Sequence, residues 1–97
     1  MKKSLMLEAL NTVVRKYGDN ILPMPYVKEA VDRFAAYDYL AGATPTTEDV
    51  RTIRDMVEAD MFRRTSNAPI RALISNACDV IAVNVAFTLA DHQLKEA

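Results

Sequence analysis

The stretch PIRALISNACDVIAVNVAFTLADHQL (residues 69–94) decides the fold of this chain. Its central eleven residues, VIAVNVAFTLA (80–90), carry no charge, and Asn84 is the strongly polar side chain among them. A helix at the surface of a protein would show a charged stripe, so we expect this segment to be a helix in the core or at an interface. The remaining chain is then expected to supply the helices that cover it.

The same segment also alternates in a way that is typical of a strand. Large apolar residues occupy every second position from 81 to 89, with small or polar residues between them. A strand needs a partner, and the chain has no second alternating segment and no Asn-Gly or Asp-Gly turn. A strand here would have to pair with another chain, so we predict a helix.

Two shorter helices are predicted in the first half of the chain. The first covers residues 4–17, with Gly18 as the residue that ends it, because glycine accepts the left-handed conformation of a helix C-cap. The second covers residues 25–41, because Pro25 suits a first helical turn and Gly42 follows the last residue.

A third helix has the clearest start. Thr46 or Thr47 can accept hydrogen bonds from the first-turn amides, and two acidic residues follow at the positive end of the helix dipole. The segment RRTSNAP (63–69) ends this helix. Short connections favour antiparallel neighbours, as in an up-and-down bundle. The sequence therefore predicts one all-α domain over residues 1–97, a small four-helix bundle-like fold with a long hydrophobic C-terminal helix.

The composition excludes some classes of protein. The 97 residues include 12 basic and 13 acidic side chains, a net charge of −1, which gives no general attraction to nucleic acid or to acidic membranes. A single cysteine cannot form an intrachain disulfide, so we expect a cytoplasmic protein held together by packing.

A membrane helix is the main competing interpretation of the C-terminal segment. Residues 72–90 carry Asp79 as their single charge, and a span needs about 20 apolar residues. An acidic residue at the centre of a span costs about 2.5–3.5 kcal/mol, and the segment also contains Asn76 and Asn84. We therefore expect no membrane insertion.

Residues that could carry catalysis are few. Cys78 and His92 are a nucleophile and a base, but fourteen residues on one helix separate them by about 21 Å. The chain has one histidine and two glycines, too few for a metal cluster or a phosphate-binding glycine loop. We expect no cofactor, no metal and no enzymatic activity. A further alternative is an enzymatic site that is assembled across subunits from Cys78 or His92.

Two apolar regions are candidates for binding a protein partner. The loop DNILPMPY (19–26) is apolar where a connection is usually polar, and two tyrosines follow the second predicted helix. The candidate partner-binding residues are Ile21, Leu22, Pro23, Met24, Pro25, Tyr37 and Tyr39. The alternative is that Ile21 and Leu22 fold under the bundle and cap its end.

The C-terminal helix also fits a heptad pattern, with Asn84 and Phe87 as the candidate oligomer seam. The positions in this register are Ile70, Leu73, Ala77, Val80, Asn84, Phe87, Asp91 and Leu94. An Asn at such a position can fix a homodimer, or it can hydrogen-bond within one chain. A second apolar row consists of Ile74, Cys78, Ile81, Val85 and Leu89.

Three arginines flank the turn between the last two helices. Arg63, Arg64 and Arg71 surround small hydrogen-bonding residues, as in a helix-turn-helix contact with phosphate. The alternative is a solvated turn whose arginines complement helix ends.

From these observations we predict a small non-enzymatic protein-binding module that modulates or inhibits a larger protein machine. Its expected partner is another protein, with a homo-oligomer as a further option. The alternative function is a dimeric helix-turn-helix-like DNA-binding regulator.

Overall fold

The uncharged C-terminal segment forms one continuous helix, α4 (Ala68–Glu96), in the computed structural model, which describes residues 4–96. Three shorter helices precede it: α1 (Leu5–Ile21), α2 (Val27–Ala36) and α3 (Thr47–Phe62). A single turn of 3₁₀ helix, η1 (Asp38–Leu40), follows α2. The described residues contain no strand, so the all-α fold class is confirmed.

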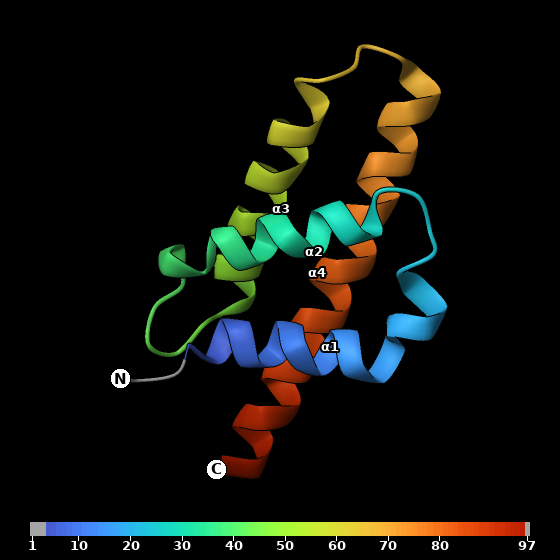
Figure 1. Cartoon of the computed structure of the whole chain (residues 1–97). Helices are drawn as coiled ribbons and strands as arrows, with labels where there is room; N and C mark the ends of the chain where they lie inside the picture. Colours follow the sequence, from blue (N-terminus) through green and yellow to red (C-terminus); the bar gives the residue numbers. More distant parts are fainter. Residues whose placement is uncertain (1–3, 97) are drawn as a thin grey trace.

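The helices form two antiparallel hairpins that lie across each other (Figure 1). The α1–α2 hairpin crosses the α3–α4 hairpin, and α4 packs against all three other helices. The antiparallel arrangement of neighbours therefore holds within each hairpin, but the four axes are not aligned as in an up-and-down bundle. The crossed arrangement allows the short α1 and α2 to reach both α4 and each other.

The inner face of α4 is the centre of the core. Its buried residues recur at helical spacing and meet large buried side chains from the other helices, among them Met6, Phe34, Ile53 and Met61. The inner face of α4 consists of Ile74, Ala77, Cys78, Ile81, Val85 and Leu89. No polar or charged side chain is buried among the described residues, so packing of apolar surface is what holds the hairpins together.

The first helix is longer than the sequence predicts. It continues through Gly18, which has no positive φ, and ends one turn later at Ile21. The side chain of Ile21 is buried in the core, and this burial favours the extra turn over a glycine C-cap.

The second helix is shorter than predicted at both ends. Tyr26 adopts a left-handed conformation with φ of 69°, so the helix begins at Val27 and Pro25 lies in the preceding turn. At the other end the chain leaves α2 after Ala36 and forms η1, so the expected helix over residues 25–41 is wrong in its limits.

The start of α3 is closed by a capping box. The Thr46 hydroxyl accepts a hydrogen bond from the Asp49 amide at 3.2 Å, and the Asp49 carboxylate accepts one from the Thr46 amide at 2.8 Å. Two amides that the helix cannot pair by itself are satisfied in this way. Of the two threonines that the sequence offered, Thr46 is the cap.

Removing this cap should weaken the fold by a defined amount. Thr46→Ala is expected to lower the free energy of unfolding by about 1 kcal/mol, the usual cost of losing an N-cap side chain. Thr47→Ala, one position later and also exposed, is the matched control and should change it by less than about 0.5 kcal/mol. Urea unfolding of both variants measures the difference, and equal effects would contradict the assignment of the cap.

Candidate functional site

The most unusual surface of the molecule is the outer face of α4, opposite its inner face. Four large apolar side chains remain exposed there: Leu73 at 43%, Val83 at 52%, Phe87 at 72% and Leu94 at 77%. Asn76 and Ala90, which are exposed, and Val80, which is half-buried and also packs against the core, lie between them. We call these seven residues the outer stripe. Asn76 is the one polar member, and none is charged.

The outer stripe follows the spacing of a coiled-coil seam. Its members alternate by three and four residues over three heptads, which keeps them on one side of a helix along its length. Leu73, Val80, Phe87 and Leu94 occupy one row, as in the register expected from the sequence. The second row is made of Asn76, Val83 and Ala90, one step away from the row that contains Ala77 and Asn84.

Asn84 lies at the edge of this surface and bonds to its own helix. Its side-chain amide donates a hydrogen bond to the Val80 carbonyl oxygen at 2.7 Å, and the residue is half-buried. A hydrogen bond of Asn84 within its own chain was the alternative to a role in an oligomer seam, and the structure contains such a bond. Phe87, the other candidate seam residue, points away from the core and is the more exposed of the two.

The acidic residues beside the outer stripe each contact a cation of the same chain. Asp79 accepts a hydrogen bond from Arg54 of α3 at 2.9 Å, and Asp91 lies 3.1 Å from the ammonium group of Lys95. Burial lowers the pKa of Arg54, but Asp55 and Glu58 outweigh this effect and raise it above its usual value. The border of the outer stripe is therefore locally neutralised, and an apolar partner would not face an uncompensated charge there.

The predicted partner-binding residues of the loop are divided between core and surface. Ile21 is buried and Leu22 packs against the core, as expected if they cap the end of the domain. Pro23, Met24 and Pro25 are exposed. The loop therefore offers a small surface in which Met24, at 39% exposed, is the large apolar side chain.

The two candidate tyrosines lie at the opposite end of α2 from this loop (Figure 1). Ten helical residues, about 15 Å, separate the two groups, so they do not form one surface. The Tyr37 hydroxyl donates a hydrogen bond to Asp60, which together with burial raises the pKa of Tyr37. Tyr39 is 71% exposed, and its ring centroid lies 6.3 Å from that of Tyr37.

The three arginines proposed for nucleic acid contact groups of this chain. Arg71 donates to the backbone carbonyls of Thr65 at 2.8 Å and Phe62 at 3.2 Å, and it stacks on the Phe62 ring. These carbonyls lie at and beyond the C-terminal end of α3, and the Phe62 carbonyl oxygen also accepts a hydrogen bond from the Thr65 amide at 3.2 Å, so Arg71 adds a charged donor to this helix end.

The other two arginines lie beside acidic residues. Arg64 pairs with Glu29 of α2, and Arg63 lies 3.6 Å from Asp60 with 79% of its side chain exposed. Burial would raise the pKa of Glu29, but hydrogen bonds from Arg64 and Arg33 lower it below its usual value. The contacts of Arg71 at the end of α3 resemble the alternative of arginines that complement helix ends, whereas the pairing of Arg64 with α2 was not predicted from the sequence.

Cys78 and His92 do not form a catalytic pair in one chain. Both lie on the continuous α4, about 21 Å apart along its axis. Cys78 is fully buried, and burial raises the pKa of its thiol to about 11, so the thiolate nucleophile is scarce at neutral pH. No group of three metal-ligating side chains comes together within the described part of the chain.

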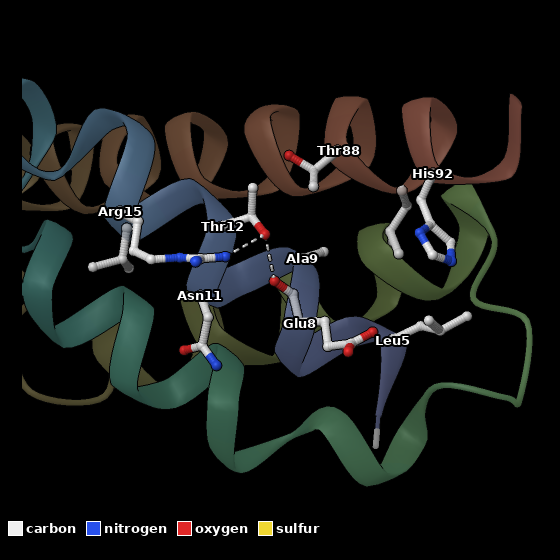
Figure 2. A pocket seen from close by; sticks show the side chains of 10 residues that line it. Leu5, Glu8, Ala9, Asn11, Thr12, Arg15, Thr88 and His92 are labelled. Carbon is white, nitrogen blue, oxygen red and sulfur yellow. Dashed lines mark hydrogen bonds between the residues drawn. The ribbon is translucent and has the colours of Figure 1, made fainter. Parts of the chain in front are cut away.

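An open groove of about 670 Å³ runs between α1 and the C-terminal half of α4 (Figure 2). Its polar side chains bond along α1: Arg15 donates to Thr12, and Thr12 donates to the Glu8 carbonyl oxygen. His92 lines the other wall. Glu8 and Arg15 are exposed and Thr12 and His92 are half-buried, and nothing in their sequence spacing distinguishes them as a site.

Comparison with known proteins adds no relative. No protein-family model, curated protein or solved structure matches this chain. By length and mean hydropathy (1.6) the Ala68–Lys95 segment is also able to span a membrane, a property that core helices of soluble proteins share. The candidate site is therefore defined by the geometry of the outer stripe.

If Arg71 is a structural cap, its removal should destabilise the fold. Arg71→Ala is expected to lower the free energy of unfolding by about 1–3 kcal/mol, because it leaves two carbonyls without a charged donor. The control Arg63→Ala removes an exposed ion pair and should cost less than about 1 kcal/mol. Equal values in thermal or urea unfolding would show that Arg71 has no capping role.

The buried thiol should give the fold a pH dependence above pH 9. In the unfolded chain Cys78 ionises with a pKa near 9, whereas in the folded chain it stays protonated until about pH 11. Between these values the unfolded state binds fewer protons, so stability falls with rising pH by up to about 1.4 kcal/mol per unit. Cys78→Ala lacks this component. Between pH 9 and 11 the unfolding free energy of the wild type should fall relative to that of Cys78→Ala. A constant difference between the two proteins would refute the prediction.

Proposed function

We propose that this protein is a non-catalytic protein-binding module that acts through the outer stripe of α4. The observation that carries the proposal is the exposure of Val83, Phe87 and Leu94 on a helix whose opposite face is the centre of the core. Contiguous exposed apolar surface is typical of a site that another molecule covers.

The energetics favour binding at this surface. Full burial of a leucine or phenylalanine side chain contributes about 1.5–3 kcal/mol, and Phe87 and Leu94 keep roughly three quarters of their surface in water. Backbone ordering adds little cost, because α4 is already a continuous helix. A partner that covers both residues therefore gains most of their burial energy.

The expected partner surface is an apolar row on a helix. The outer stripe has coiled-coil spacing and carries no charge, so it selects by shape and burial and not by ion pairs. In this proposal the chain is a cytoplasmic modulator or inhibitor that attaches to a larger assembly through one helix face. The DNA-binding alternative gains no support from the arginine contacts at the α3–α4 turn.

A matched pair of variants tests the proposal. Phe87→Asp should abolish capture of the partner from an extract of the native host, whereas Tyr39→Asp should retain it. The two positions are 72% and 71% exposed, so each variant adds the same charge to an equally exposed aromatic site. The captured protein is then purified and its affinity measured for both variants. Undiminished binding by Phe87→Asp would disprove the role of the outer stripe.

A further inference from the structure

We infer that the partner of the outer stripe is a second copy of this chain, bound with the two α4 helices antiparallel about a two-fold axis. The inference rests on the proposed function, because the second copy covers the same surface, and the dimer must open before the outer stripe can attach to a larger assembly. An uncharged apolar row needs another such row opposite it, and the chain itself carries one. In a two-fold dimer one self-complementary patch is used twice.

The sizes of the side chains favour the antiparallel arrangement. One row of the outer stripe is bulky (Leu73, Val80, Phe87 and Leu94), and the other is smaller (Asn76, Val83 and Ala90). Parallel helices place each row against itself, so wide layers would alternate with narrow ones. Antiparallel helices place three of the four bulky residues (Val80, Phe87 and Leu94) against a smaller one, which keeps the distance between the axes even over these layers, and Leu73 lies beyond the last of them.

The register follows from the most exposed residues. Phe87 faces Val83 of the second copy, and Val80 faces Ala90 of the second copy, each pair occurring twice. Leu94 then faces Asn76 in the outermost layers, where the Asn amide keeps access to water. Asp79 and Asp91 lie beside the seam with Arg54 and Lys95 as their own counter-ions, so closing the dimer places no unpaired acid in it.

The extent of the outer stripe sets the expected affinity of the dimer. The outer stripe is about 31 Å long, and Phe87 at 72% exposed offers on the order of 100–180 Å² of surface. Counted from both copies this gives a small interface, which is typical of reversible association. We therefore expect a dissociation constant in the micromolar range.

Sedimentation of the full chain from about 1 to 300 µM tests the association. The wild type and Tyr39→Asp should approach twice the 10.8 kDa of one chain, whereas Phe87→Asp should bind itself about 30-fold or more weakly. Circular dichroism shows that each variant is folded. A wild type that stays monomeric overturns the inference and leaves the proposed function to its own test. Dimerisation unaffected by Phe87→Asp overturns it as well.

Cysteine cross-linking tests the orientation. A mixture of affinity-tagged Val80→Cys and untagged Ala90→Cys should form a mixed disulfide dimer under mild oxidation. Neither variant alone should form one, because antiparallel packing separates like positions by about 15 Å along the axis, too far for a disulfide. The wild type is the negative control, because its single cysteine, Cys78, is buried and should not form a disulfide. A disulfide in Ala90→Cys alone would indicate parallel helices and overturn the arrangement.

A lipid surface is the competing occupant of the outer stripe. The wild type should not co-sediment with phosphatidylcholine vesicles at concentrations where it is dimeric, because the dimer covers the apolar surface. Binding of monomeric wild type to these vesicles, lost in Phe87→Asp, would assign the outer stripe to lipid and overturn the inference.

Discussion

Burial of the inner face of α4 is the constraint on which the rest of the structure depends. Every other helix packs against it, and no buried ion pair or disulfide within the described residues supports the arrangement. A chain of 97 residues has little apolar surface to spare for a second core. The length and position of the other helices are therefore set by how they cover Ile81 and its neighbours on this face.

This constraint explains why α4 is apolar on two sides. One side meets α1, α2 and α3, which cover it completely at Cys78, Ile81 and Val85. The antiparallel α3 and the crossing α1 and α2 all lie on one side of α4 and do not enclose its far side, so most of the outer stripe stays exposed. A helix that is hydrophobic all round is normally buried all round. The packing of a single chain therefore does not explain why this side of α4 is apolar, and the proposed partner would explain it.

The sequence predicts those features that local chemistry determines. The uncharged helix, a break within RRTSNAP (63–69) and the N-cap of α3 follow from residue types and their spacing. The limits of α1 and α2 depend on burial of Ile21 and on the left-handed Tyr26, which local preference does not reveal. The register of the outer stripe could not be predicted from the sequence for a similar reason. Two rows that differ by one residue, containing Asn84 or Val83, satisfy the same heptad rule, and the covering helices select between them.

The continuity of α4 also makes the molecule stiff along one direction. Its 29 residues span about 43 Å, nearly the full 44 Å length of the domain, with no kink-forming proline or glycine after its first turn. The C-terminal end projects beyond α1 (Figure 1). A continuous helix of this length fixes the distance and the direction between the α3–α4 turn and the C-terminal end of α4.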